Sequence, residues 1–185
     1  LTDDLRLLNC SRPCTGSASI LLASKEIAEK YTDMPIWITG IGQKTTSAGF
    51  TKNTSLTSME STVIAGQSAL KMSNHNISEI DVAEVHDAFS VCEPMALESL
   101  GFTNPGQGIN MVQKLHETDN FMINPRGGLI GSGHPLGATG ISQTIEIVQQ
   151  LQKTAGNRQT NNPKTGLVHN MSAAATSSTV LVLEK

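Results

Sequence analysis

Cysteine is scarce in this chain, which has three in 185 residues: Cys10, Cys14 and Cys92. An odd number of cysteines, without the spacing of metal ligands, gives neither a disulfide framework nor a zinc site. We therefore expect reduced thiols, no bound metal and a cytoplasmic location.

Long apolar runs are also missing. No stretch approaches the roughly 20 apolar residues that cross a bilayer, and the start of the chain lacks the basic-then-apolar pattern of a secretory signal. The formal net charge of −3 gives no general attraction to nucleic acid or to an anionic membrane. The first residue is not methionine, which predicts a fragment or a processed product. With 38% hydrophobic and 16% charged residues, the chain is expected to form a soluble globular domain with a real core.

The most distinctive stretch is residues 124–140, NPRGGLIGSGHPLGATG, which holds six glycines. Glycine permits positive φ and close approach of the backbone, and apolar residues at 141, 145 and 148 predict that a helix follows directly. The start of a helix offers unpaired N–H groups and the positive end of a dipole. His134, in the middle of this glycine loop, is suited to donate to a developing oxyanion or to take a proton from a nucleophile. The alternative interpretation is a loop that only turns a strand into a helix.

The rest of the chain alternates predicted strands and helices, which indicates a layered α/β sheet. Thr57 and Glu60 have the spacing of a capping box before one helix. Ligands of such sheets bind beyond the carboxyl ends of the strands, where the glycine loop and the sequence HDAF (residues 86–89) both fall. The predicted strands are 16–24, 36–42, 82–85, 166–171 and 179–183, and the predicted helices are 25–31, 59–72, one that ends at 100, 111–115 and 141–153.

Three motifs stand together: HDAF, the glycine loop, and HNMSAAATSS (residues 169–178) between the last two predicted strands. This combination resembles the C-terminal half of the thiolase family, most closely the sterol-carrier-protein-type thiolases and their archaeal and bacterial relatives. The resemblance extends over essentially the whole chain. It implies a thiolase-type α/β half with a mixed five-stranded sheet and helices on both faces.

The resemblance also implies the Claisen chemistry of an acetyl-CoA acetyltransferase or a 3-ketoacyl-CoA thiolase. In that family a cysteine thiolate takes an acyl group from coenzyme A, and the enolate of a second acyl-CoA attacks it. Such chemistry needs a nucleophile, a base and donors for two oxyanions. By resemblance, His134 activates the cysteine and binds an oxyanion, and His86 acts where the enolate forms. No cofactor is implied beyond the acyl-CoA thioester, which is the substrate.

Four further residues are predicted, by the same resemblance, to bind substrate. They are Gly133, Asn124, Phe89 and Asn170. Partners implied by the resemblance are acyl-CoA, an N-terminal thiolase half and further copies of the full-length protein in a dimer or tetramer.

The chain departs from the family pattern where the acid/base cysteine belongs. One family position holds Ala88, and the other corresponds to Asn170 and the two residues after it. Cys92 is one helical turn beyond Ala88 and is a candidate replacement, although a buried, inert cysteine is the simpler interpretation. His169 is a second candidate base, with the same alternative. The SAAA sequence that replaces a glycine-rich loop is expected to narrow the room for a ligand.

The family's domain boundary divides the chain into residues 1–34, the tail of a missing N-terminal half, and residues 35–185, the C-terminal domain. The nucleophilic cysteine would then lie outside this chain, which predicts an inactive fragment of an active acyltransferase. Two alternatives stay open because no acid/base cysteine is present. One is a non-catalytic acyl-CoA-binding or assembly subunit, and the other is a thiolase-like retro-aldolase.

Overall fold

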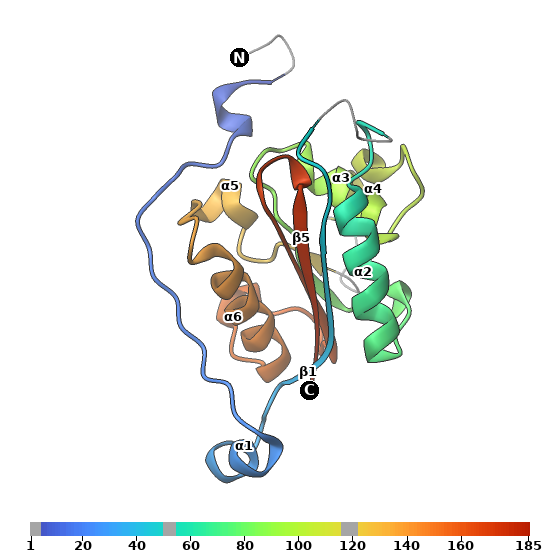
Figure 1. Ribbon diagram of the computed structural model, residues 1–185. Helices are drawn as coiled ribbons and strands as arrows, with labels where there is room; N and C mark the ends of the chain where they lie inside the picture. The colour runs from blue at the N-terminus through green and yellow to red at the C-terminus, as the bar shows by residue number, and fades with distance from the viewer. Residues whose placement is uncertain (1–4, 50–54, 116–121) are drawn as a thin grey trace.

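A mixed five-stranded sheet forms the centre of the computed structural model, which describes residues 5–49, 55–115 and 122–185 (Figure 1). The strand order is β1-β5-β4-β2-β3. β5 pairs antiparallel with β1 and β4, whereas β2 pairs parallel with β4 and β3. The predicted α/β class and mixed five-stranded sheet are confirmed. The strands are β1 (Trp37–Thr45), β2 (Val82–Glu84), β3 (Met122–Ile123), β4 (Thr165–Met171) and β5 (Ser177–Glu184).

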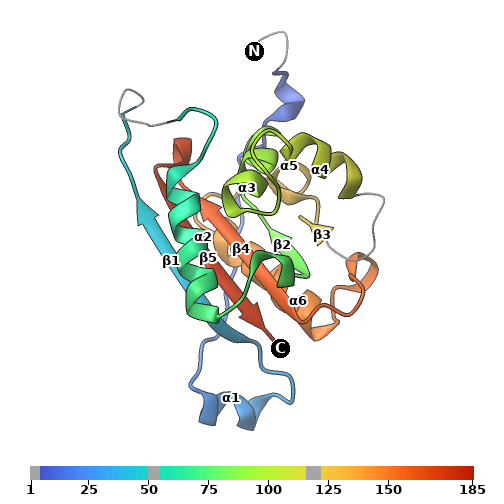
Figure 2. The same ribbon diagram turned by 90° about the vertical axis from the view of Figure 1, so that its right-hand side faces the viewer.

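Helices cover both faces of this sheet, as predicted. Figure 2 shows α2 (Glu60–Ser73) and α3 (Cys92–Leu100) on one face and α6 (Thr139–Gln152) on the other. None of the helices in the described ranges is both long and apolar enough to cross a membrane. The shorter helices are α1 (Lys25–Tyr31), α4 (Gly108–Leu115) and α5 (Gly128–Ser132), and 3-10 turns lie at Leu7–Asn9, Ile77–Glu79, Gly156–Arg158 and Ala173–Ala175.

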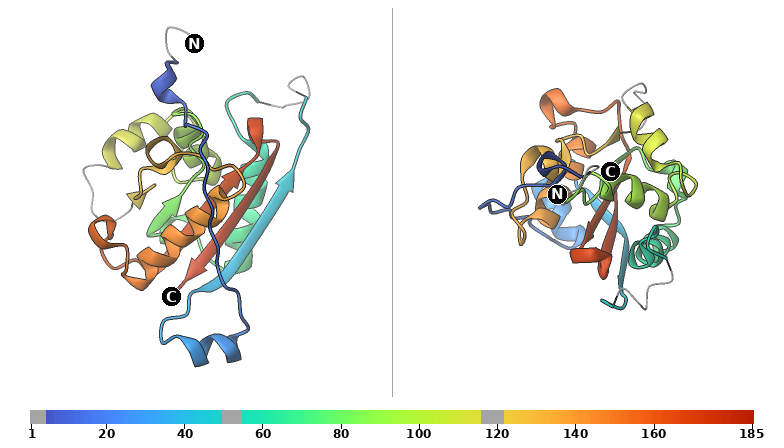
Figure 3. Two further views of the ribbon diagram at one scale, coloured as in Figure 1. Left: turned by 90° about the vertical axis from the view of Figure 1, so that its left-hand side faces the viewer. Right: turned by 90° about the horizontal axis from the view of Figure 1, so that it is seen from above.

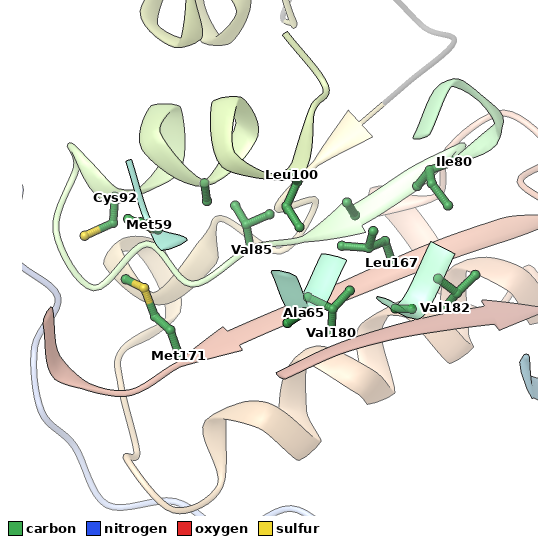
Figure 4. Close-up of a cluster of buried hydrophobic side chains, with 13 residues drawn as sticks. Met59, Ala65, Ile80, Val85, Cys92, Leu100, Leu167, Met171, Val180 and Val182 are labelled. Atoms are coloured by element: carbon green, nitrogen blue, oxygen red, sulfur yellow. The ribbon is translucent and has the colours of Figure 1, made fainter. Parts of the chain in front are cut away.

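The larger hydrophobic core lies between the sheet and the pair α2 and α3 (Figure 4). Its residues come from the inward face of each element, for example Ala65 on α2, Leu100 on α3 and Leu167 on β4. Burying apolar surface at about 25 cal/mol per Å² makes this layer the main source of stability. The core therefore fixes β2 and β4, whose carboxyl ends carry the functional motifs.

The α6 face of the sheet is packed differently. Ile147 and Leu151 join a small apolar cluster with the sheet, but Gln143, Glu146 and Gln150 of the same helix are also buried. The apolar residues of the predicted periodicity, at 141, 145 and 148, are only half-buried. Of the buried polar side chains, Gln143 bonds to β4, whereas Glu146 and Gln150 bond to residues 158–160, which follow the helix.

The strand predicted at residues 16–24 is not formed. This segment has no strand pairing in the part of the chain that the structure describes, and it runs as an irregular arm on the α6 side of the sheet (Figure 3). Leu21 is 94% exposed and Leu22 is 70% exposed. A strand needs a neighbour for its backbone groups, and this apolar run finds none here. The prediction was wrong because an apolar composition does not reveal whether a pairing edge is available.

Other boundaries differ in smaller ways. The capping box predicted at Thr57 and Glu60 is absent, because α2 begins at Glu60 with Met59 as its N-cap and Thr57 bonds to Ser55 instead. The helix predicted at 111–115 begins earlier, at Gly108. α5 and β3 were not predicted, since five and two residues are too few for a periodic pattern to emerge.

We predict that Gly42→Ala destabilises the fold by about 1–3 kcal/mol, the usual cost of overpacking. A methyl group there would overlap the carbonyl oxygen of Ala65 and lie 2.8 Å from its carbonyl carbon, which forces α2 away from β1. Urea-induced unfolding would measure the change in the free energy of unfolding. Gly131→Ala is the matched control, because a methyl group at Gly131 meets nothing within 4 Å. Equal stability of the two variants would contradict the prediction.

Candidate functional site

The HDAF motif forms the loop that follows β2, and Asp87 anchors this loop to the glycine loop. The Asp87 carboxylate accepts hydrogen bonds from the backbone N–H groups of Leu129 (2.6 Å) and Ile130 (3.4 Å), at the start of α5. A side chain at Gly128 would lie 2.6 Å from Oδ1 of Asp87, so only glycine permits this approach. A buried carboxylate at a helix start is favourable because it satisfies unpaired donors there.

Asn124, the first residue of the glycine loop, holds the other side of the junction. Its Oδ1 accepts from the N–H of Val85 at 2.8 Å, and its Nδ2 donates to Glu93 on α3 at 2.7 Å. The side chain therefore continues the backbone pairing beyond β2 and β3. It is not among the residues that line the cavity described below, and its predicted contact with substrate stays a prediction.

His134 lies between Gly133 and the start of α6. Its Nδ1 is 2.7 Å from Oγ1 of Thr139, and its backbone N–H donates to the carbonyl of Arg12 in the N-terminal arm. Gly133 has φ +88°, and a side chain there would lie 2.8 Å from Sγ of Cys14. Gly133 thus lets the arm and the glycine loop pack together, which sets the position of His134.

The structure brings His86 and His134 together. Their ring centroids are 5.0 Å apart and the rings meet edge to face at 86°. Both line a cavity of about 640 Å³ beyond the carboxyl ends of β2 and β4. Its wall is largely apolar on the α3 side, where Ala88, Phe89, Cys92 and Met95 lie.

Burial keeps both rings neutral at neutral pH. Loss of water lowers the pKa of His86 to about 4, with a smaller contribution from the nearby His134. Burial also lowers the pKa of His134, partly opposed by the charge of Asp87. A neutral imidazole has one donor and one acceptor nitrogen, so each ring can give one hydrogen bond to an anion in the cavity.

The other predicted site residues fall into two groups. Phe89, Asn170 and Cys92 line the cavity, and burial raises the pKa of the Cys92 thiol, which keeps it protonated. His169 does not line the cavity; it is a residue of β4 whose side chain is fully buried toward α2, where its Nε2 lies 3.0 Å from Oγ1 of Thr62. This position argues against His169 as a base for a bound substrate.

The sequence prediction missed residues that shape the site from behind. Gln143 of α6 is fully buried and bonds to Asn170, and Thr139 bonds to His134. The only signal was a polar stripe at 143, 146 and 150 on α6, which looks like a solvated face when no tertiary contact is known.

The SAAA turn forms one edge of the cavity, and its narrowing of the room for a ligand stays a prediction. Ala174 and Ala175 have φ +56° and +51°, a conformation that is unusual for residues other than glycine. The hydroxyl of Ser61 donates to the carbonyl of Ala175 at 2.6 Å and holds the turn in place.

Within the described residues, no three His, Cys, Asp or Glu side chains are gathered so that they could hold a metal ion. The cavity presents hydrogen-bonding side chains, among them the two imidazoles and Asn170. Two imidazoles facing one half-apolar cavity are suited to bind a carbonyl oxygen and stabilise negative charge on it.

Comparison with known proteins identifies the family of the chain. Residues 42–185 match the model of the family described as thiolase C-terminal domain-like. The chain belongs to this family.

Two relatives set the scale of the similarity. The chain is 35% identical to an acetyl-CoA acetyltransferase of Methanothermobacter thermautotrophicus, with 100% of the chain and 49% of that protein covered. It is 35% identical to human sterol carrier protein 2, with 91% of the chain and 32% of that protein covered. The chain therefore spans about half the length of the first relative and about a third of the second.

A solved structure, the Ltp2-ChsH2(DUF35) aldolase, has the same fold. Its TM-score to this chain is 0.83 at 20% identity, with 100% of this chain and 48% of that chain covered. At this identity the likeness concerns the fold alone.

Neutral, buried histidines make stability depend on pH. The folded-state pKa of His86 is about 4 and that of His169 about 3, both lowered mainly by burial, whereas unfolded histidine has a pKa of about 6.5. Between these values the unfolded chain binds more protons, so the free energy of unfolding falls as the pH falls below about 6.5, by about 1.4 kcal/mol per pH unit for each histidine.

We predict that His169→Gln, which keeps a polar group for Thr62, reduces this pH dependence. Urea-induced unfolding between pH 7 and pH 4 would measure it. The difference in slope between wild type and variant isolates the histidine from the carboxylates that titrate in the same range. Identical slopes would contradict the prediction.

Proposed function

We propose that this chain is the C-terminal part of an acyl-CoA acyltransferase of the acetyl-CoA C-acyltransferase type. The observation that carries the proposal is the pairing of His86 and His134 at 5.0 Å over one cavity. The acetyl-CoA acetyltransferase named among the relatives supports the reaction class. The reaction is the condensation of two acyl-CoA thioesters or its reversal, thiolysis.

In this proposal a cysteine thiolate from an N-terminal half attacks a thioester carbonyl, forms a C–S bond and releases the thiolate of coenzyme A. A base other than the two imidazoles takes an α-proton from a second acyl-CoA, and the resulting carbanion attacks the acyl-enzyme carbonyl, which breaks the C–S bond and frees the cysteine as a thiolate. Negative charge develops on a carbonyl oxygen in both steps. His134 and His86 donate hydrogen bonds to these oxygens, and the apolar part of the cavity wall strengthens such bonds.

The proposal includes an N-terminal half that packs on the α6 side and a dimer or tetramer of the full-length protein. The half-buried apolar residues at 141, 145 and 148 and the exposed arm lie on that side (Figure 3). No lysine or arginine lines the cavity in the described ranges, so the phosphates of coenzyme A would be held outside it. The length covered in the relatives agrees with a second half.

A second candidate function is a non-catalytic acyl-CoA-binding subunit. It is favoured by Ala88 and Asn170, which stand where the family pattern has a cysteine for proton transfer. A retro-aldolase on the same scaffold would likewise need no acid/base cysteine. Assays of acyl transfer, thiolysis and carbon–carbon cleavage on the full-length protein separate the three.

We predict that His134→Ala in the full-length protein lowers the rate of acyl transfer from acetyl-CoA by at least about 10²-fold, the usual effect of losing an oxyanion donor. Intact-mass spectrometry of the acyl-enzyme would follow the rate. His75→Gln is the control, since His75 lies beyond the far end of α2, beside Glu184. Acylation of His134→Ala at the normal rate would contradict the role of His134.

We predict that Cys92→Ala leaves the condensation rate within about twofold, because burial raises the pKa of this thiol and disfavours proton transfer. The rate of acetoacetyl-CoA formation measures it, with Cys10→Ala as the comparison. A fall of about 10²-fold, the range of lost acid–base catalysis, would instead make Cys92 the acid/base residue.

A further inference from the structure

The side chains of Gln143, Asn170 and His86 form a row of hydrogen bonds that ends at the wall of the cavity. Gln143 on α6 donates through Nε2 to the backbone carbonyl of His169 on β4, at 3.3 Å. Asn170, the next residue of β4, donates through Nδ2 to Oε1 of Gln143 at 2.9 Å. The same Nδ2 lies 3.0 Å from Nδ1 of His86.

The direction of this row is set at its buried end. A backbone carbonyl can only accept, so the NH₂ group of Gln143 must face His169 and its oxygen must face Asn170. Asn170 must therefore present its NH₂ group, with one hydrogen for Gln143 and the other for His86. Gln143 is fully buried and His86 is 5% exposed, whereas Asn170 is half-buried at the cavity wall.

This direction of the hydrogen bonds determines the tautomer of the His86 imidazole. Nδ1 of His86 accepts a hydrogen bond, so the single proton of the neutral ring is on Nε2. Nε2 is therefore the nitrogen available to donate to a molecule in the cavity that His86 lines. The opposite tautomer would present a lone pair there, which repels a developing oxyanion.

We propose that Gln143 and Asn170 are positioning residues that hold His86 as an Nε2–H donor toward the cavity. Asn170 then acts through His86, because both hydrogens of its nitrogen bond to protein acceptors. The catalytic meaning of this row rests on the proposed function, whereas the tautomer is a property of the folded chain itself.

The tautomer is measured directly by ¹⁵N NMR of the histidine rings in the full-length protein, with the His86→Asn spectrum as the assignment. Wild type should show the Nε2–H tautomer of His86. Gln143→Met keeps the side-chain length but removes both hydrogen bonds, and should give a mixture of tautomers. Gln149→Met is the control, because Gln149 is on the same helix but outside this row. An Nδ1–H tautomer in wild type, or a full Nε2–H tautomer in Gln143→Met, would overturn the proposal.

A second variant tests the same row by a substitution on β4 in place of one on α6. Asn170→Asp is nearly isosteric, but a carboxylate can only accept, so it should place a proton on Nδ1 of His86. Both variants should lower kcat, by up to about 10²-fold, because one oxyanion donor is weakened. KM should change by less than about twofold because ground-state binding is kept. Unchanged kcat with an altered tautomer would overturn the catalytic role.

A wild-type protein that acts on no acyl-CoA would instead refute the proposed function, and the NMR result would still decide the tautomer. If Gln143→Met fails to fold, the Asn170→Asp spectrum decides it.

Discussion

The carboxylate of Asp87 joins the two loops on which the histidines depend. It accepts from two backbone N–H groups at the start of α5, and Gly128 is the residue that lets it come close. Burial raises the pKa of Asp87, but the N–H groups favour its charged form. Because the Asp87 side chain is buried and its partners are backbone groups, this contact helps to set the distance between the HDAF loop and the glycine loop.

A second set of contacts supports the same junction from the sheet side. Arg126 of the glycine loop pairs with the buried Glu84 at the end of β2, at 3.2 Å, although burial raises the pKa of Glu84 to about 8. Asn124 ties the loop to β2 and α3. Polar contacts of Asn124, Arg126 and Glu84 thus position the glycine loop in place of apolar packing. These three side chains do not line the cavity, whereas the two imidazoles do.

Much of the architecture could be predicted from the sequence because strands and helices of ordinary length carry a clear pattern. β2, β4 and β5, the helices α2 and α6, and the helix end at Gly101 all lie close to the expected positions. The arm was mispredicted because its apolar run resembles a buried strand, while burial depends on a neighbour that the pattern does not contain. α5, with five residues, and β3, with two, are too short for a periodic pattern to repeat.

The candidate site was likewise predictable only in part from the sequence. His86 and His134 carry local motifs, so their proximity could be inferred from the positions of two strand ends. Gln143 and Asn170 are 27 residues apart and carry no motif that links them. Their relation arises from how α6 lies against β4, with Gln143 turned toward the strand, and only the three-dimensional arrangement reveals it.

The two left-handed alanines of the SAAA turn carry backbone strain. A left-handed residue other than glycine costs roughly 1–2 kcal/mol, and alanine at positive φ does not recover this cost through its smaller unfolded-state entropy. The hydroxyl of Ser61, which donates to the carbonyl of Ala175, is one contact that offsets the strain. Part of the cavity edge is thus backbone held in a sparsely populated conformation by the structure around it.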